Sequence, residues 1–503
     1  MEPPPQKGVS MFKPSSFQAA VFEFIKNGEG SAVIEAVAGS GKTTTIVNSL
    51  NNIPSDKKVI MLAFNKVIAD ELSSRVKLPN VEIKTIHAAG FAALRNINRN
   101  LKVDNNKIND SIAGYCKHYN LNPKDIRGFE NVKRIVSLGK NSGIGILCEN
   151  NFGSWENVIN HHAIFDDNNA VDFKEIVTAC CEILDHSANY NRTVIDFDDM
   201  IYMPIYHKAN FKKYDFVFVD EAQDCSEINR IILKNLLKND GRLIAVGDPY
   251  QAIYGFRGAA SDSMSMIKKE FSAVSLPLSV SYRCATSIIA EARKTVSHIL
   301  PFDGAEKGSV VRVDRYIPSY FHKDDAIICR NTAPLISMAY SLISRDIPVN
   351  VLGRDIGKGL ITLVMSFKAK SISDMLFNLE TWYMKQCKSL QDSGNEHKIA
   401  AISDKVNCIR IFIKNMEENS SVKDLTNMID GFFGESINGN LTLATCHKAK
   451  GKEWNRVFIL DEETFRPSWV TLDWMKQQEE NIVYVAVTRA KNSLIFIKSD
   501  SWQ

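Results

Sequence analysis

The segment Ala36-Val37-Ala38-Gly39-Ser40-Gly41-Lys42-Thr43 constrains the fold of this chain more than any other part of the sequence. It follows an apolar strand run and precedes the helical pattern Thr44-Thr45-Ile46-Val47. In that strand–loop–helix setting, glycines let backbone N–H groups surround phosphate oxygens, and the helix N-terminus adds positive potential. The common form of this loop has glycine where Ala36 stands, and alanine is small enough for the same turn. The segment therefore predicts a loop that binds the phosphates of a nucleotide.

The residues at the end of this loop have distinct expected roles. Lys42 meets the outer phosphates and takes part in catalysis, and Thr43 is a ligand of Mg²⁺. ATP and Mg²⁺ are therefore the expected substrate and cofactor. The predicted phosphate-binding set comprises Ala38, Gly39, Ser40, Gly41, Lys42, Thr43 and Thr44.

An acidic segment, Asp220-Glu221-Ala222-Gln223-Asp224, follows the strand run at 216–219. Carboxylates at the end of a buried strand can hold magnesium and position water for attack on a phosphate. We expect Asp220 to be the second metal ligand and Glu221 to be the base that orients the attacking water. An acidic turn exposed to solvent is the alternative for this segment alone, and the phosphate loop favours the catalytic interpretation.

A third segment, residues 246–258, joins an amide to aromatic and cationic side chains directly after another strand run. Gln251 could sense the γ-phosphate of ATP. Tyr254, Phe256 and Arg257 offer flat and cationic surfaces for the bases and backbone of single-stranded DNA. An aromatic cluster that closes a hydrophobic core is the alternative interpretation.

Short apolar, β-branched runs followed by glycine or acidic residues indicate buried parallel strands with chemistry at their carboxyl ends. Amphipathic helical stretches lie between these runs, so we predict an α/β fold of two tandem parallel-sheet domains, the first and second motors. The strand runs are 31–36, 59–63, 216–219 and 243–246 in the first half, and 326–329, 441–444, 457–460 and 494–497 in the second.

Two lysine-rich segments with a helical pattern and no strand runs interrupt this alternation, and each is predicted to be an insertion into one motor. The first motor is expected at 1–93 and 192–275, with its insertion at 94–191. The second motor is expected at 276–358 and 436–503, with a shorter insertion at 359–435.

Composition agrees with a soluble globular protein, since 45% of residues are hydrophobic and 24% are charged. The net charge of +3 is too small to identify a nucleic-acid binder, although a basic groove can lie within a nearly neutral total. The ten scattered cysteines indicate reduced thiols, no apolar run is long enough to span a bilayer, and the first residues lack a secretion signal. These features predict a cytoplasmic, nucleoid-associated protein with no membrane partner.

The motifs resemble those of the UvrD/Rep-type superfamily-one DNA helicases, and most closely the F-box DNA helicase branch. Phe17-Gln18 precedes the phosphate loop, and the resemblance implies that Gln18 hydrogen-bonds adenine. Residues 63–66 and 85–87 resemble the family segments of the first motor that touch single-stranded DNA. The DNA contacts implied by these two segments are Phe64, Asn65 and His87.

Three segments of the second half continue the resemblance in family order. Residues 280–283 resemble the motif whose tyrosine stacks on adenine and whose arginine reaches the γ-phosphate. Residues 445–453 resemble the motif that couples DNA to nucleotide, and residues 484–491 resemble the motif with the second arginine finger. The resemblance implies ATP contacts at Tyr282, Arg283, Glu453 and Arg489, and DNA contacts at Thr445 and His447.

The resemblance implies that the two α/β domains are RecA-like and form an ATP-dependent DNA helicase. Such a helicase is expected to move 3′-to-5′ along single-stranded DNA in replication, recombination or repair. Its implied substrates are single-stranded DNA and forked or tailed duplexes, and replication or recombination proteins are compatible partners. In this scheme Arg283 and Arg489 complete a catalytic site formed by Lys42, Asp220, Glu221 and Gln251. The sequence has no F-box, and a motor of this size suits a bacteriophage or a bacterium.

Some features depart from the family pattern or leave alternatives open. Phe256 stands where many relatives have tryptophan, and Lys452 replaces an apolar residue. The short second insertion keeps open a translocase that strips proteins from single-stranded DNA without productive unwinding. A binding module that does not hydrolyse ATP would lack the acid or an arginine finger, and this sequence has both. No nuclease is expected after the last strand run. The loop with Trp469 and Trp474 is either a strand-separating element or core, and residues 196–199 are either near the DNA path or a solvated turn.

Overall fold

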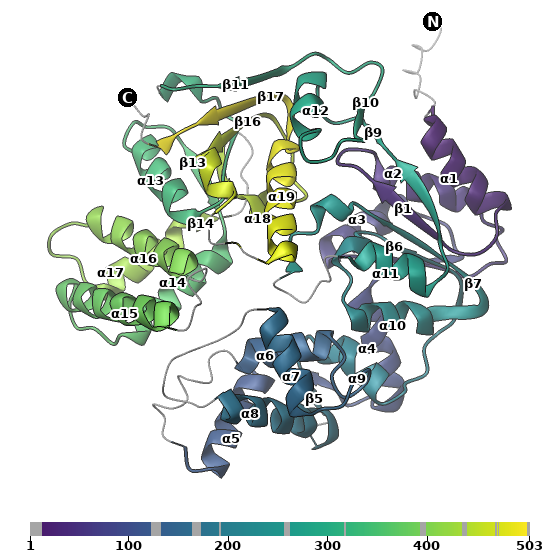
Figure 1. Ribbon diagram of the computed structural model, residues 1–503, viewed down its shortest axis with the longest axis horizontal. Helices are drawn as coiled ribbons and strands as arrows, with labels where there is room; N and C mark the ends of the chain where they lie inside the picture. Colours follow the sequence, from purple (N-terminus) through teal and green to yellow (C-terminus); the bar gives the residue numbers. More distant parts are fainter. Residues whose placement is uncertain are drawn as a thin grey trace, which may run out of the picture.

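Two parallel sheets, each flanked by helices, form the protein (Figure 1). The computed structural model describes residues 13–121, 132–162, 173–190, 193–255, 262–315, 318–392, 399–434, 440–467, 470 and 472–499. The strands of the first sheet lie between residues 32 and 278 and those of the second between residues 309 and 497, and helix α19 (Asp473–Val487) stands between the two sheets. The predicted fold class, two tandem RecA-like α/β domains, is confirmed.

The first sheet has six parallel strands in the order β3-β2-β6-β7-β1-β8. Its central strands are apolar and buried on both faces, as expected for a parallel sheet covered by helices. Because the strands are parallel, the segments that follow them lie along one edge. The strands are β1 (Ala32–Ala36), β2 (Val59–Ala63), β3 (Val81–Thr85), β6 (Tyr214–Val219), β7 (Leu237–Gly247) and β8 (Val274–Leu278).

The second sheet has seven parallel strands in the order β11-β17-β16-β12-β15-β13-β14. A separate pair, β9 (Val280–Ser281) with β10 (Leu300–Pro301), lies where the chain passes from the first motor to the second. The strands of the second sheet are β11 (Ser309–Arg312), β12 (Ala326–Cys329), β13 (Val349–Leu352), β14 (Phe433–Gly434), β15 (Leu441–Thr445), β16 (Trp454–Leu460) and β17 (Ala490–Ile497).

Side chains that cap helix N-termini set where several helices of the first motor begin. Ser15 and Gln18 form a reciprocal capping box on α1, Asn65 caps α3, and Thr85 caps α4. The helices of the first motor are α1 (Ser16–Asn27), α2 (Lys42–Ser49), α3 (Lys66–Arg75), α4 (Ile86–Ile97), α9 (Asp199–Tyr206), α10 (Glu227–Leu236) and α11 (Ser263–Glu270). Those of the second motor are α12 (Thr286–Ala292), α13 (Thr332–Ile343), α18 (Cys446–Ala449) and α19.

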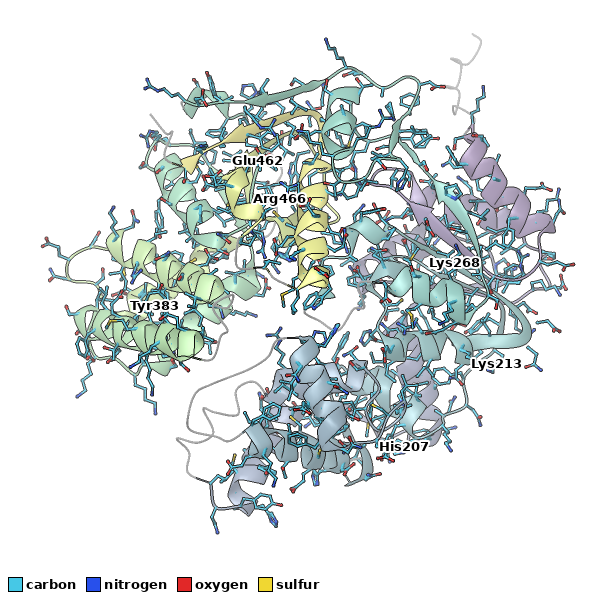
Figure 2. The ribbon with its side chains drawn as sticks, in the orientation of Figure 1. His207, Lys213, Lys268, Tyr383, Glu462 and Arg466 are labelled. Carbon is cyan, nitrogen blue, oxygen red and sulfur yellow. The ribbon has the colours of Figure 1, made fainter. Side chains whose placement is uncertain are left out.

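Two further groups of helices correspond to the two predicted insertions and lie apart from each other in Figure 1. Figure 2 labels Tyr383 within the second group and His207 beside the first. The first group is α5 (Lys107–His118), α6 (Val132–Asn141), α7 (Phe152–His161) and α8 (Phe173–Asp185), with the short pair β4 (Lys102–Val103) and β5 (Val194–Ile195). The second group is α14 (Arg354–Ser366), α15 (Ile372–Asp392), α16 (Ile399–Lys414) and α17 (Val422–Phe432).

Each insertion shares a hydrophobic core with its own motor. One cluster runs from Val33 and Ile60 of the first sheet to Trp155 of α7, and another joins Ile327 of the second sheet to Phe412 of α16. A third cluster crosses between the motors, because Val37 and Ala38 of the phosphate loop pack with α12 and α19. The insertions are thus parts of the motors rather than separate domains.

All eight predicted strand runs are strands in the structure, whereas the remaining strands were not predicted. Every residue of β3 is partly exposed at one edge of the sheet, and β8 at the other edge contains Pro277, which an edge strand tolerates. The two predicted insertion segments also contain short strands, β4 and β14. The exact domain boundaries remain a prediction, and β8 runs to Leu278 within the first sheet.

The ten cysteines are free thiols in the structure. Among the helices of the described ranges, we found none with the length and apolar composition required to cross a membrane.

Two helix glycines in the first insertion give opposite stability predictions. Alanine usually stabilises a helix interior by about 1 kcal/mol relative to glycine. A Cβ added at Gly139 of α6 would overlap the fully buried ring of Trp155, whereas a Cβ at Gly114 of α5 would meet no atom within 4 Å. We expect Gly139→Ala to lower the free energy of unfolding by about 1–3 kcal/mol, the usual cost of overpacking. The matched control Gly114→Ala should raise it, and thermal unfolding that ranks the two variants the other way would contradict this packing.

Candidate functional site

The phosphate loop between β1 and α2 lies where the two motors meet. Gly39 and Gly41 have φ angles of 72° and 75°, a left-handed conformation that glycine adopts readily. A Cβ on Gly39 would overlap that of Arg283 from the second motor. Tyr282 N–H donates to Gly39 O at 2.9 Å, and Ala38 N–H donates to the Tyr484 hydroxyl at 2.8 Å. The second motor therefore contacts two successive residues of the loop.

The loop and the acidic segment bring the predicted catalytic groups of the first motor together. Lys42 Nζ lies 3.3 Å from Glu221 Oε1, and Thr43 Oγ1 lies 3.5 Å from Asp220 Oδ2. Glu221 has a φ of 53°, and its N–H donates to Asp220 Oδ1 at 2.9 Å. This left-handed turn points the two adjacent carboxylates at different partners, one at Lys42 and one at Thr43.

Burial and neighbouring charges give these groups different protonation behaviour. Burial alone would raise the pKa of Glu221, but attraction first by Lys42 and then by Lys450 lowers it to about 2. Burial raises the pKa of Asp220 to about 6, and repulsion by Glu221 adds to this effect. Burial opposes the charge on Lys42, but attraction by Glu221, Asp248 and Asp220 outweighs it and raises the pKa of the ammonium. Glu221 is therefore ionised at neutral pH, as required of a group that orients water by accepting a hydrogen bond.

The charges of this site suit a divalent cation. Two lysines face four carboxylates, and burial raises the pKa of Asp224 to about 6 despite the attraction of Lys450. A surplus of buried carboxylate oxygens favours a hard cation with oxygen ligands. The two lysines are Lys42 and Lys450, and the four carboxylates are those of Asp220, Glu221, Asp224 and Asp248.

The loop also offers a group for phosphate oxygens. Ser40 Oγ is buried and has no hydrogen-bond partner within the described ranges, which fits a donor to a phosphate oxygen. Thr44 is partly exposed in the first turn of α2, next to Lys42 and Thr43. The residues present therefore fit a nucleotide with magnesium.

Gln18 connects three parts of the predicted adenine side. Its amide Nε2 donates to Thr45 Oγ1 of α2 at 3.0 Å, and its Oε1 accepts from Ser15 N at 3.0 Å in the capping box of α1. The Tyr282 hydroxyl lies 3.4 Å from the same Oε1, and the Tyr282 side chain is 43% exposed. The structure thus brings Gln18 and Tyr282 together, with the tyrosine accessible for stacking.

The two predicted arginine fingers lie side by side in the second motor with their charges engaged. Arg283 Nε donates to Glu453 Oε2 at 2.6 Å, and Glu453 also pairs with Lys491 at 2.6 Å. Arg489 is buried and donates to the backbone carbonyls of Val485 at 2.8 Å and Lys452 at 3.0 Å. Burial, followed by repulsion from Arg283, lowers the pKa of Arg489 to about 10.

A chain of polar contacts runs from the phosphate loop to the second motor, and three of its members, Gln223, Asp248 and Lys450, had no predicted role. The Gln223 amide donates to Glu221 Oε2 and its Oε1 accepts from Asp248 N at 3.0 Å. The Gln251 side-chain amide donates to Asp248 Oδ2 at 2.6 Å, and the backbone carbonyl of Gln251 accepts from Lys450 Nζ at 2.8 Å. The chain links Lys42, Glu221, Gln223, Asp248, Gln251 and Lys450.

Lys450 is the end of this chain and a contact between the motors. Its Nζ pairs with Asp224 Oδ2 at 2.7 Å and lies 4.6 Å from the centroid of the Tyr254 ring. Both charged side chains are largely buried, with exposed fractions of 9% for Lys450 and 2% for Asp224. In the sequence, Lys450 is one of three lysines at alternate positions between 448 and 452, and the pattern does not show which of them is buried.

Three of the predicted DNA contacts, Phe64, Thr445 and His447, lie near Tyr254 or line a cleft with it. The rings of Phe64 and Tyr254 are nearly parallel with centroids 6.2 Å apart, and Phe64 is 40% exposed. His447 lies on the other motor, with its ring 6.4 Å from that of Tyr254. Tyr254, Thr445 and His447 line one cleft together with Arg330, Lys405 and Lys448, three basic residues that were not predicted.

A second aromatic pair lies on the first motor. The exposed ring of Phe197 stacks on His87 at 3.9 Å with an interplanar angle of 22°. Burial lowers the pKa of His87 to about 4, so its imidazole is neutral at physiological pH. Asn65 uses its side-chain oxygen to cap α3 by accepting from Ile68 N at 2.9 Å. In the segment 196–199, Asp196 and Asp199 are buried and Phe197 is exposed, so the segment is not a solvated turn, and its place near the DNA path remains a prediction.

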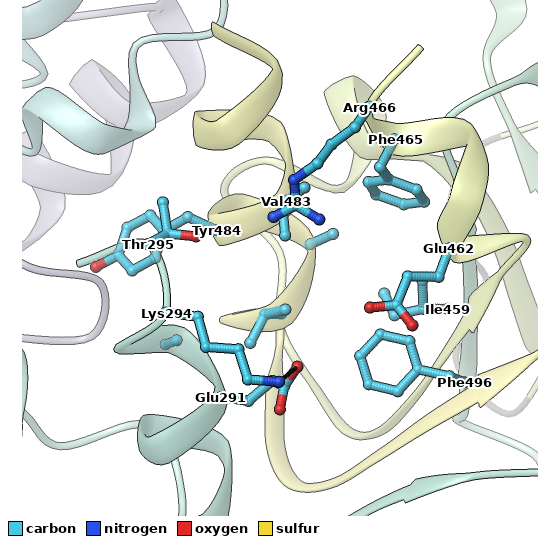
Figure 3. Close-up of a pocket in the computed structure, with 13 residues that line it drawn as sticks. Glu291, Lys294, Thr295, Ile459, Glu462, Phe465, Arg466, Val483, Tyr484 and Phe496 are labelled. Atoms are coloured by element: carbon cyan, nitrogen blue, oxygen red, sulfur yellow. Dashed lines mark hydrogen bonds and ion pairs between the residues drawn. The ribbon is translucent and has the colours of Figure 1, made fainter. Parts of the chain in front are cut away.

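Three predicted residues, Phe256, Arg257 and Trp469, lie outside the described residues. Trp474 is described and stacks on His161 of the first insertion at 5.6 Å. A separate small pocket behind α19 is lined by Ile459, Val483 and Phe496, with Tyr484 also on its wall (Figure 3). The side chains that line it include none of those predicted to bind ATP, so it is distinct from the nucleotide site.

The two motors match two parts of one family. Residues 18–272 match the UvrD/REP helicase N-terminal domain, and residues 361–501 match the UvrD-like helicase C-terminal domain. The chain belongs to the UvrD/Rep helicase family. The resemblance predicted from the motifs is thereby confirmed.

Among curated UvrD/Rep relatives, the F-box DNA helicase protein 1 of Schizosaccharomyces pombe is 23% identical over 92% of this chain and 55% of its own length. The F-box DNA helicase 1 of Gallus gallus is 23% identical over 93% of this chain and 47% of its own length. A probable DNA helicase of Mycoplasma pneumoniae is 23% identical over 93% of this chain and 80% of its own length. The chain thus spans about half the length of the two F-box relatives.

Removing Lys450 tests whether the polar chain carries coupling between the two sites. We expect Lys450→Met to reduce the stimulation of ATPase by single-stranded DNA at least about fivefold, since coupling free energies are typically about 1–3 kcal/mol. In the double variant Lys450→Met/Asp224→Asn, the carboxylate that lost its partner is also removed. This should not restore stimulation, because the contact between the motors is still missing. The control Lys452→Met removes the same charge from an exposed side chain of the same loop. Equal stimulation in Lys450→Met and the wild type would contradict the assignment.

Proposed function

We propose that this chain is an ATP-dependent DNA helicase that moves along single-stranded DNA by opening and closing the cleft between its motors. The observation that carries the proposal is the polar chain from Lys42 to Lys450, which ends beside Tyr254. It joins the residues that fit ATP to the aromatic residues that fit DNA bases. Its last member belongs to the opposite motor, so a change at either site must act on the interface.

In the proposed hydrolysis step, the first motor holds the phosphates and the second supplies the arginines. Lys42 and the loop N–H groups balance phosphate charge, while Thr43 and Asp220 would hold magnesium, which neutralises developing charge when bound. Glu221 orients the attacking water, and Gln251 reports the γ-phosphate to the chain of contacts. Arg283 and Arg489 complete the site only when the motors are closed.

Closure would act as a switch because the arginines contribute so much to the rate. Arginine fingers in phosphoryl transfer increase kcat by about 10³–10⁵. Arg283 is paired with Glu453 beside the phosphate loop, so a γ-phosphate would compete with that carboxylate for the guanidinium. If the γ-phosphate replaced Glu453 as the partner of Arg283, nucleotide binding would change the contact between the motors.

DNA grip would come from stacking on the aromatic residues at the ends of parallel strands. Each stacked base contributes about 1–3 kcal/mol, and separating one base-pair step costs about 1.4 kcal/mol. Bases released by fraying where the duplex meets the single strand could therefore be trapped by stacking on Phe64, Tyr254, His87 and Phe197. We propose 3′-to-5′ movement on the basis of the family resemblance.

Glu221→Gln tests the hydrolysis step. The amide fills the same space but cannot supply the carboxylate charge that orients water, so ATP should still bind while turnover falls at least about 100-fold, the lower range for loss of an acid–base group. Nucleotide binding is measured with a fluorescent ATP analogue and turnover by phosphate release. Lys42→Ala serves as the comparison, because it should lose both. If Glu221→Gln loses nucleotide affinity as Lys42→Ala does, its proposed role is wrong.

Unwinding of tailed duplexes tests the activity and its direction together. With ATP, we expect displacement of the strand from a 3′-tailed duplex and a fork, and little from a 5′-tailed duplex. Removal of recombinase filaments from single-stranded DNA is assayed in parallel. Filament removal without strand displacement would favour the protein-stripping translocase, and DNA-independent ATPase with neither activity would reject both.

A further inference from the structure

A cluster of four buried charges lies in the first motor, away from the ATP site. Lys107 Nζ of α5 is 2.6 Å from Asp199 Oδ2 and 3.2 Å from the Ser187 carbonyl. Lys140 Nζ of α6 is 2.8 Å from Asp196 Oδ2 and 2.7 Å from Asp199 Oδ1. Each of the four charged side chains is at most 9% exposed. The two lysines belong to the insertion, and the two aspartates belong to the turn that leads into α9.

Hydrogen bonds within the cluster and to α6 hold this turn in place. Asp199 N donates to Asp196 Oδ1 at 2.7 Å, and Asp196 N donates to Asp199 Oδ2 at 3.1 Å, so the two carboxylates close the turn on itself. Asp198, between them, accepts from Ser137 Oγ at 2.6 Å and Asn141 Nδ2 at 3.3 Å. Ser137, Lys140 and Asn141 share one face of α6, so a single helix face contacts all three acidic residues.

Only the aromatic side chain of the turn projects outward. Phe197 is 55% exposed and stacks on His87, while its acidic neighbours are tied to α5 and α6. Every displacement of the turn relative to the insertion would therefore shift the Phe197 ring.

Stability alone does not account for four charges in this position. Apolar residues of similar volume often replace a buried ion network without loss of stability, whereas leaving one charge unpaired is strongly destabilising. Burial by itself would raise the pKa of Asp199, but attraction by Lys140 and Lys107 lowers it. At Asp196 and Lys107 burial outweighs the attractions, so the pKa of Asp196 is raised and that of Lys107 is lowered. Such a network defines one geometry, because any slip of the turn would break several short contacts together.

We propose that Lys107, Lys140, Asp196 and Asp199 are positioning residues that fix the Phe197 ring as a base-stacking surface. The inference rests on the proposed function, since it requires single-stranded DNA to cross the first motor. It gives the first insertion a role in grip: its helices α5 and α6 set where the aromatic surface stands.

A double-mutant cycle tests this role. The substitution Lys140→Met/Asp196→Asn removes one charge of each sign and retains an amide oxygen for Asp199 N–H, so the remaining Lys107–Asp199 pair stays neutral. It is combined with Phe197→Ala, and the affinity for a fluorescein-labelled oligothymidylate is measured by anisotropy for all four proteins. Phe197→Ala should weaken binding about five- to 150-fold, the range for one stacked base. The double substitution Lys140→Met/Asp196→Asn should weaken DNA binding at least about threefold when Phe197 is present. It should cause no further loss of affinity when Phe197 is replaced by alanine.

A milder pair of variants keeps the test independent of folding. Ser137→Ala removes only the 2.6 Å hydrogen bond that the serine hydroxyl donates to Asp198. The control Ser111→Ala also removes one serine hydroxyl, but that hydroxyl donates to the Lys107 carbonyl within its own helix and not to the turn. We expect weaker DNA binding for Ser137→Ala alone, with the loss absent in the Phe197→Ala background. Equal losses with and without Phe197, or unchanged binding in the double substitution Lys140→Met/Asp196→Asn, would overturn the positioning role. If the wild type binds no single-stranded DNA, the proposed function itself fails, together with this inference.

Discussion

The buried charges around Lys42 constrain the rest of the structure. Asp220, Glu221, Asp224 and Asp248 converge because parallel strands deliver their carboxyl ends to one edge of the sheet. Isolated buried carboxylates are costly, so each needs a cation or donors. Lys42 satisfies part of this demand from within the first motor. Lys450 satisfies another part from the second motor, which makes contact between the motors an electrostatic requirement of the site.

The phosphate loop carries this constraint into the apolar interface. Val37 and Ala38 pack against α12 and α19, and Gly39 gives space to Arg283. The residues predicted to bind phosphate are thus also a contact surface between the motors. Closing or opening the interface would move the arginines relative to the phosphates without any change inside either sheet. The two insertions share cores with their motors, so they would move as parts of them.

Local patterns made much of this predictable. The apolar runs identified the central strands, and the phosphate loop, the acidic segment and the arginine motifs identified residues that do meet at one edge. What the sequence could not show depends on contacts between distant segments. The pairing of Lys450 with Asp224 requires both motors to be in place, and the stacking of Phe197 on His87 requires two loops to meet. The burial of Lys107 and Lys140 could not be read from the sequence, because it arises only when the turn at 196–199 packs against α5 and α6.

We propose that the nucleotide and DNA sites are coupled energetically across the interface between the motors. The most direct test is the affinity of the wild-type protein for single-stranded DNA with and without a non-hydrolysable ATP analogue. The affinity for the analogue is then measured with and without DNA. We expect the analogue to change DNA affinity about 5- to 150-fold and, by linkage, DNA to change nucleotide affinity by the same factor. DNA affinity that does not respond to the analogue would contradict the proposed coupling.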